Sequence, residues 1–239
     1  MIKVLSFTAR MAGASRGEFE RYWMDVHVPM WRNIESIRGY AVSTIAADHT
    51  RGDVSTIAMG PVDGIVEIWY DDEAAMSRSA NSSAGQAWRA DSAKFIGGMR
   101  SFLTREQAII PISSSPRPRI KALSMVARPA DRSRSDFLQY WSCVHAPIAR
   151  RVPLLQGFVL SHKLRDLFRT DIATIATDRE PDGFTSSYVE SLDARKAMVQ
   201  SAEARHWFTD GASLLGAVRT FVVEEQIVHL PPPASTASA

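Results

Sequence analysis

The chain has 239 residues, of which 45% are hydrophobic and 23% charged, a composition typical of a globular protein and not of a disordered chain. Its 28 Lys and Arg residues against 26 Asp and Glu residues give a net charge of +2, which excludes the strongly basic surface of a nucleic-acid-binding or membrane-surface protein. The single cysteine, Cys143, excludes a disulfide framework and a thiolate zinc site. No apolar run reaches the roughly 20 residues that span a bilayer. Because Lys3 and Arg10 interrupt the opening apolar residues, we expect no signal peptide and a cytoplasmic protein without nucleic-acid or membrane partners.

The first predicted elements are a strand and an amphipathic helix. Residues 2–10 are β-prone, and Ser15 followed by Glu18 has the spacing of a capping box at a helix start. The helix that follows has one apolar stripe, formed by Phe19, Tyr22, Trp23, Val26, His27 and Met30. The later elements are predicted as a strand at 39–45, a strand at 65–70, a helical stretch at 72–96 broken near Gly85, and a strand at 100–110.

The same order recurs further along the chain. With an offset of 118, 18 of the 42 positions from residue 2 to residue 43 are identical, where unrelated sequences would share about two or three. After a one-residue insertion the offset becomes 119, and Trp88 then matches Trp207. A repeat of this length is too long for a solenoid unit and indicates two homologous domains. We assign residues 1–110 and 119–230 to the two copies, 111–118 to a Pro- and Ser-rich linker, and 231–239 to a disordered tail.

The order βαββαβ in each copy is that of a ferredoxin-like unit, whose antiparallel sheet has helices on one face only. The other face needs a cover, and a second copy in the same chain can supply it. The predicted fold class is therefore α+β, with two tandem ferredoxin-like repeats whose sheets form one intramolecular α+β barrel with a central cavity. The chain could still form a homodimer.

Two strings of residues carry a family resemblance. The first is Phe19-x-x-Tyr22-Trp23-x-x-x-His27-x-Pro29 followed by Gly39-Tyr40, and the second is Asp63-Gly64-x-x-Glu67-x-Trp69-Tyr70. Together they resemble the EthD family of the dimeric α+β-barrel superfamily. The second copy matches the first string at residues 137–147 but departs from the second string, because Ser186 and Tyr188 stand in place of Glu67 and Trp69. The resemblance implies the barrel fold and leaves several activities open, among them lactone isomerases and polyketide-tailoring dehydratases and decarboxylases.

Two histidines are the first catalytic candidates. His27 and His145 occupy the same position on the apolar stripe of each copy, and a histidine there can serve as a general acid or base. The alternative is a core histidine that holds the end of its helix through a backbone hydrogen bond.

Glu67 and Tyr40 distinguish the first copy from the second. Alternation along 65–70 places Glu67 among apolar neighbours, where it could form a catalytic pair with His27. It could instead form a structural ion pair with Arg10 or Arg100. The Tyr40 phenol could donate to a developing oxyanion or could be an aromatic wedge in the core. The second copy has Ser186 and Phe158 at these positions, so the first copy is predicted to hold the better-equipped site.

The interior is rich in aromatic residues, part of which we expect to wall a flat, apolar pocket for a hydrophobic cyclic or aromatic ligand. The candidate substrate-binding residues are Tyr22, Trp23, Trp69, Trp88, Tyr140, Trp141 and Tyr188.

The chain has no dinucleotide, P-loop or metal-ligand motif, so no cofactor and no metal is expected. Haem stays open, because barrels of the same superfamily bind it through a histidine. The leading hypothesis is a cofactor-independent lyase, dehydratase or isomerase in the catabolism of cyclic or aromatic compounds. The alternatives are a non-catalytic carrier for such a molecule and a cofactor-free monooxygenase.

Overall fold

The computed structural model describes residues 1–112 and 120–234. Of the predicted linker at 111–118, only the first two residues belong to this part, and the predicted disordered tail is described only as far as Ala234. The described start of the tail lies against the first copy, where Pro231 covers Gly39. None of the helices in the two described ranges is long and apolar enough to cross a membrane.

The two copies have the predicted order of elements. The first half contains β1 (Ile2–Arg10), α1 (Arg16–Tyr22), η1 (Trp23–His27), η2 (Val28–Asn33), β2 (Ile37–His49), β3 (Gly64–Tyr70), α2 (Glu73–Asn81), α3 (Ser83–Ser92) and β4 (Ile96–Ile110). The second half contains β5 (Ile120–Ala127), α4 (Arg134–Tyr140), η3 (Trp141–His145), α5 (Ala146–Ile148), η4 (Ala149–Arg151), β6 (Gly157–Leu167), β7 (Ala173–Thr174), β8 (Gly183–Val189), α6 (Leu192–Gln200), α7 (Ala202–Leu214) and β9 (Ala217–His229).

The first helix begins as predicted and then departs from regular α-helical geometry. Ser15 and Glu18 form a reciprocal capping box. At η1 the backbone makes a π-helical turn, in which the N–H of Val28 bonds to the carbonyl of Trp23. The wider turn keeps Trp23 and His27 buried but leaves Val26 46% exposed, so Val26 is not part of the buried stripe. The same π-helical turn recurs at η3 and ends on His145.

The predicted helical stretch at 72–96 consists of two helices that meet at Ser82, close to the break predicted near Gly85. Ser82 ends α2 and caps α3, because its hydroxyl accepts a hydrogen bond from the N–H of Gly85. The two helices approach so closely here that a Cβ atom on Gly85 would lie 1.9 Å from the carbonyl oxygen of Ser79. Gly85 is therefore needed for this close approach and not for the break itself.

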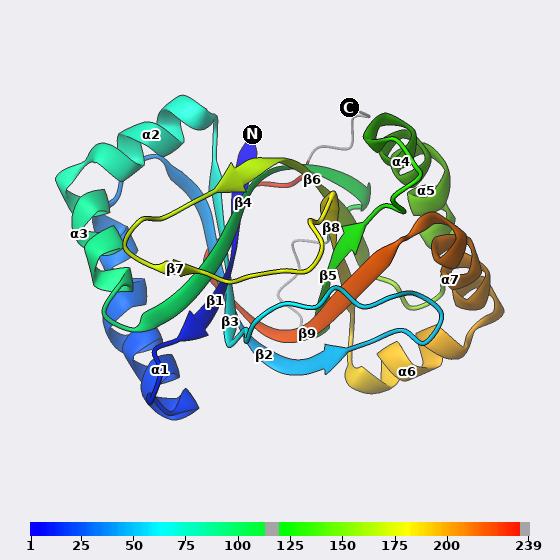
Figure 1. Cartoon of the computed structure of the whole chain (residues 1–239), viewed down its shortest axis with the longest axis horizontal. Helices are drawn as coiled ribbons and strands as arrows, with labels where there is room; N and C mark the ends of the chain where they lie inside the picture. The colour runs from blue at the N-terminus through cyan, green and yellow to red at the C-terminus, as the bar shows by residue number, and fades with distance from the viewer. Residues whose placement is uncertain (113–119, 235–239) are drawn as a thin grey trace.

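Eight strands close into one antiparallel barrel within the single chain. Each half contributes a four-stranded sheet, and the halves join where β2 pairs with β9 and where β4 pairs with β6. Figure 1 shows the helices of the first half on one side of the barrel and those of the second half on the opposite side. The predicted α+β barrel of two ferredoxin-like repeats is confirmed.

The middle of the barrel is filled by side chains and not by the predicted central cavity. Four fully buried phenylalanines converge there, with ring centroids 4.8–6.3 Å apart in the contacting pairs. They are Phe7, Phe102, Phe184 and Phe221. A cavity of about 790 Å³ reaches the inward-facing side chains of Lys3, Trp69 and Glu106, whereas the cavities beside the two histidines lie outside the barrel wall, between each sheet and its helices.

The Asp-Gly pairs of the family motif are structural. Asp63 accepts hydrogen bonds from the backbone N–H and the guanidinium of Arg10, and Asp182 bonds to Arg128 in the same way. A Cβ atom on Gly64 would lie 2.3 Å from the ring of Trp23. The motif thus fixes the tryptophan at the start of the π-helical turn against the sheet.

The two half-barrels depend on each other for their sheet edges. Residues 1–112 expressed alone would expose the β2 and β4 edges that normally pair with the second half, together with the apolar inner face of the sheet. We expect this fragment to dimerise or aggregate, as measured by light scattering after size-exclusion chromatography. A stable, soluble monomer would contradict the interdependence.

Candidate functional site

His27 lies in a hydrogen-bonded cluster under the helices of the first half. Its Nδ1 is 2.9 Å from Asp91 Oδ2, and both side chains are buried. The hydroxyl of Tyr22 donates to the other oxygen of Asp91 at 2.8 Å. Trp88 stacks on the imidazole at 5.4 Å and donates its indole N–H to the backbone carbonyl of His27. Asp91 thereby fixes the orientation of the ring and leaves Nε2 as the nitrogen available for proton transfer.

The second half repeats this cluster around His145. The Nδ1 atom of His145 is 2.6 Å from Asp210 Oδ2, and Tyr140 donates to Asp210 Oδ1 at 2.9 Å. Trp207 stacks on the imidazole at 5.9 Å. The His–Asp pair is therefore a property of both halves.

The two aspartates were missed by the sequence analysis, although the repeat itself contained the signal. Asp91 and Asp210 each follow their tryptophan by three residues, so they match at the same offset as Trp88 and Trp207. One helical turn separates the two positions, which places the carboxylate and the indole on the same face of the helix. Extending the alignment along this helix would have identified the partner of each histidine.

Burial disfavours the protonated, charged form of both imidazoles. Burial lowers the pKa of His27 and of His145 below 6.5, and the neighbouring aspartates only partly oppose this effect. A nearby arginine also lowers each pKa: Arg169 for His27, and Arg51 for His145. Each histidine is thus held in the basic form that can accept a proton.

A first cavity of about 390 Å³ lies beside His27. Its walls are mostly apolar and include Trp23, Tyr40, Val66, Ile68, Met76 and Trp88. The hydroxyl of Tyr40 is fully buried and has no hydrogen-bond partner among the described residues. The structure therefore brings Tyr40 and His27 into one cavity, where the tyrosine holds an unused donor.

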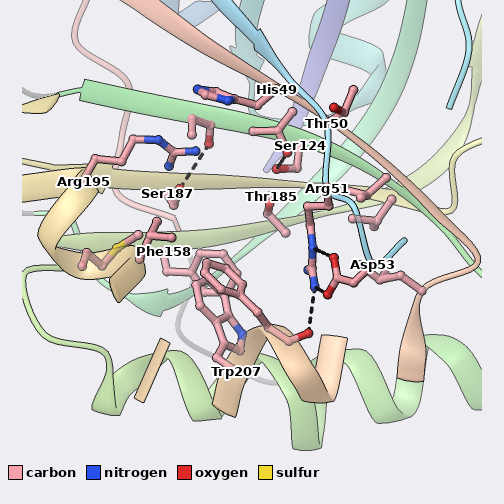
Figure 2. Close-up of a pocket in the computed structure, with 18 of the residues that line it drawn as sticks. His49, Thr50, Arg51, Asp53, Ser124, Phe158, Thr185, Ser187, Arg195 and Trp207 are labelled. Carbon is pink, nitrogen blue, oxygen red and sulfur yellow. Dashed lines mark hydrogen bonds and ion pairs between the residues drawn. The ribbon is translucent and has the colours of Figure 1, made fainter. Parts of the chain in front are cut away.

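A second cavity of about 650 Å³ lies beside His145. Phe158 takes the place of Tyr40 in its wall, next to Trp207. Figure 2 shows Phe158 and Trp207 on one side of this cavity, with Thr185 and Ser187 on the sheet and Arg195 reaching across from α6. This cavity is larger than the first.

Each cavity is closed by a segment of the other half. Residues 49–53, at the end of β2, line the second cavity, and residues 165 and 167–169, at the end of β6, line the first. Arg51 pairs with Asp53 and donates to the carbonyl of Phe208 at 2.8 Å. In the symmetric contact, Arg169 donates to the carbonyl of Arg89 at 2.6 Å. Neither half has a complete cavity by itself.

Comparison with known proteins agrees with this architecture. The family model described as the EthD domain matches residues 12–98 and 130–216, more than half of the chain. The chain belongs to the EthD family. The two matches contain the two histidines and their aspartates, so each EthD domain carries one His–Asp pair.

Among curated proteins, the 4-carboxymethyl-4-methylbutenolide mutase of Pseudomonas reinekei is 26% identical over 106 residues, which are 44% of this chain and 98% of the mutase. Among solved structures, an anthrone oxidase-like protein superposes with a TM-score of 0.59 at 10% identity, covering 99% of this chain and 96% of that one. A candidate monooxygenase of Fusobacterium nucleatum subsp. nucleatum superposes with a TM-score of 0.57 at 9% identity, over 100% of this chain and 95% of its own. In each case a single chain of the solved structure superposes on both halves of this chain, so the fold is shared over its whole length.

Glu67 is not brought together with His27. Alternation along β3 turns Glu67 into the barrel, whereas Val66 and Ile68 face the helices and the first cavity. Glu67 accepts hydrogen bonds from Lys3 at 2.9 Å and from Lys121. The proposed pairing of His27 with Glu67 therefore has to be corrected to His27 with Asp91.

The ion-pair partners proposed for Glu67 also need correction. Arg10 pairs with Asp63, and Arg100 pairs with Asp166 and Glu180. The lysines that pair with Glu67 each have an outer carboxylate as well, Glu106 for Lys3 and Glu225 for Lys121. Burial alone would raise the pKa of Glu67, but Lys121 and Lys3 hold it well below its usual value.

The predicted substrate-binding aromatics divide into three sets. Trp23 and Trp88 line the first cavity, and Trp141 lines the second. Tyr22 and Tyr140 hold the aspartates of the His–Asp pairs. The last two, Trp69 and Tyr188, lie in the barrel beside Lys3 and Lys121 and away from both histidines. Each follows an inward-facing residue by two positions along its strand, so its side chain also faces inward.

Proposed function

We propose that the protein is a cofactor-independent enzyme of the isomerase or lyase (dehydratase) type that moves protons on a hydrophobic cyclic or aromatic compound bound in the first cavity. His27 would act as the general acid and base, with Asp91 orienting its ring. Tyr40 would donate a hydrogen bond to the oxygen on which negative charge develops.

The His–Asp pair supports the proposed proton transfer. A carboxylate on Nδ1 selects the tautomer in which Nε2 carries the lone pair, and it stabilises the imidazolium that forms when Nε2 takes a proton. Burial keeps the pKa of His27 below 6.5, so the resting group is the base. The surrounding apolar wall strengthens every charge interaction formed during the reaction.

The observation that carries the proposal is the Tyr40 hydroxyl. A buried donor without a partner costs roughly 1–3 kcal/mol, and folded proteins seldom keep one without a use. A carbonyl or lactone oxygen of a bound substrate would satisfy this hydroxyl. Since Tyr40 and His27 line the same cavity, one substrate could meet both groups.

The mutase relative suggests a first compound to test. Its name specifies a methyl-substituted butenolide and an isomerase-type reaction. A butenolide has a carbonyl oxygen for the donor, and where carbon 4 of the ring carries a hydrogen, a base can remove that proton because the resulting anion is conjugated with the carbonyl. Where carbon 4 carries two substituents, as in the compound that names the mutase, the carbon next to the carbonyl takes up a proton only after the compound's own carboxylate has added to the ring double bond and formed the enolate. We therefore take methyl-substituted butenolides as the starting substrate class.

Tyr40→Phe tests this assignment. In D₂O, the wild-type enzyme should incorporate deuterium at carbon into 4-carboxymethyl-4-methylbutenolide or an uncharged methylbutenolide, as followed by proton NMR. Tyr40→Phe, which reproduces the residue of the second half, should slow this exchange by about 10- to 1000-fold because the oxyanion loses its donor. The free energy of unfolding should stay the same or rise, since the change removes a hydroxyl that has no partner.

Full exchange activity in Tyr40→Phe would contradict the role of the hydroxyl. Saturable binding without exchange, unchanged in the variant, would instead indicate a carrier. A turnover that stops when dissolved oxygen is removed would indicate a monooxygenase.

A further inference from the structure

The two cavities differ in a consistent way at one patch of wall. Three residues of the first cavity, Val66, Ile68 and Met76, are apolar. Their counterparts in the second cavity at the offset of 119 are Thr185, Ser187 and Arg195. All three positions are apolar in the first cavity and polar in the second, and one of the polar side chains carries a positive charge. Because β3 and β8 correspond strand for strand, the polar residues share one patch that the first half keeps apolar.

Arg195 is a half-buried cation without a counter-ion. Within residues 1–112 and 120–234 its guanidinium forms no ion pair and no side-chain hydrogen bond, although it lines the cavity and points across it toward Ser187 (Figure 2). In contrast, Arg51 of the same cavity pairs with Asp53, and Arg165 of the first cavity pairs with Glu73. A guanidinium removed from water without a carboxylate partner is unfavourable unless a ligand supplies the anion.

The rest of the second cavity suits an acid with an aromatic or apolar body. Phe158 and Trp207 form an edge-to-face pair at 5.0 Å and present apolar ring surfaces on one side of the cavity. The indole N–H of Trp207 is buried and has no partner among the described residues, whereas that of Trp88 is used inside the first half. The cavity thus combines an apolar wall with an unpaired guanidinium.

We infer that the second cavity binds the carboxylate group of a small hydrophobic or aromatic acid, with Arg195 as the bidentate partner of the carboxylate and Phe158 and Trp207 holding the ring. Arginine is suited to this role because its planar fork matches the two carboxylate oxygens. The site is distinct from the first cavity and does not depend on proton transfer at His27.

The test measures binding of 2-naphthoate and of its uncharged analogue 2-naphthamide by isothermal titration calorimetry. The wild-type chain should bind 2-naphthoate more tightly than 2-naphthamide. Arg195→Met, which installs the residue of the first half, should weaken 2-naphthoate binding by about 10- to 100-fold, the usual effect of losing a charge-assisted hydrogen-bonded pair. The same variant should leave 2-naphthamide binding almost unchanged.

Two further variants control the comparison. Arg78→Met removes an equal charge from an exposed position of α2 that lines neither cavity, and should not change 2-naphthoate binding. Arg195→Gln keeps a polar side chain and should behave like Arg195→Met if the charge is what matters, and melting curves establish that each variant is folded. The inference is overturned if folded Arg195→Met or Arg195→Gln binds 2-naphthoate as tightly as the wild type, or if Arg78→Met weakens this binding equally. It is also overturned if the wild type binds 2-naphthoate and 2-naphthamide equally, or shows no saturable binding of 2-naphthoate up to about 10 mM.

Discussion

Replacing Glu67 with glutamine should lower the free energy of unfolding by about 3–5 kcal/mol, the usual cost of removing one partner from a buried ion pair. Glu67 is 1% exposed and bridges two lysines that are each 1% exposed. Without its charge, Lys3 and Lys121 would repel each other inside the barrel, each with one outer carboxylate left. Urea-induced unfolding, followed by tryptophan fluorescence, measures the loss.

Glu106→Gln is the matched control for this change. Glu106 pairs with Lys3, but its side chain is 13% exposed, so water can partly replace the lost charge and the destabilisation should be smaller. Adding Lys121→Met to Glu67→Gln should cost less than the two single changes added together, because the double variant removes a lysine that has lost its central partner. Strict additivity, or equal losses for Glu67→Gln and Glu106→Gln, would contradict the bridging role.

The same variant tests whether Glu67 takes part in catalysis. Since Glu67 faces the barrel interior and the first cavity lies on the opposite face of β3, turnover per folded molecule should be nearly unchanged in Glu67→Gln. A loss of activity at constant folded fraction would restore the functional pairing with His27 that the geometry does not support.

The repeat in the sequence was sufficient to predict the barrel. Identical residues at a constant offset defined two copies, and the one-sided burial of each sheet required a second sheet to cover it. The capping box at Ser15 and the strand at 2–10 were predicted from local chemistry that tertiary contacts did not alter. The π-helical turns were not predicted, because a single extra residue per turn leaves little trace in an apolar stripe.

The candidate site was predicted only in part. His27, Tyr40 and Trp88 do share a cavity, as their buried positions indicated. Glu67 was misplaced, because alternation along a strand shows that two faces exist but not which of them meets the helices. The partner of His27 lies 64 residues away in sequence, and the closing segments come from the opposite half, so such contacts depend on topology rather than on local pattern.

The two histidines provide the test of which cavity is catalytic. His27→Ala should lower turnover by about 10² to 10⁴, the usual contribution of a positioned acid or base, because the first cavity alone combines a His–Asp pair with the unused tyrosine donor. His145→Ala should cost about 1–3 kcal/mol of stability through lost packing and the unmet hydrogen bond of Asp210, with activity per folded molecule nearly unchanged. Initial rates and melting curves of both variants, measured side by side, decide the matter.

The pH dependence identifies the histidine by its chemistry. Because the pKa of His27 is lowered, the basic form persists at neutral pH, and kcat/KM should fall only when the pH drops below about 6.5. Asp91→Asn removes a carboxylate that raises this pKa, so the fall of kcat/KM on the acid side of the pH profile (the acid limb) should move to still lower pH. The kcat value should also fall at least tenfold, because the imidazole ring of His27 is no longer held in its orientation. A merely structural Asp91 would change stability without moving the limb. If activity is lost only in His145→Ala, catalysis belongs to the second cavity, and a carboxylate bound by Arg195 would then be part of the substrate itself.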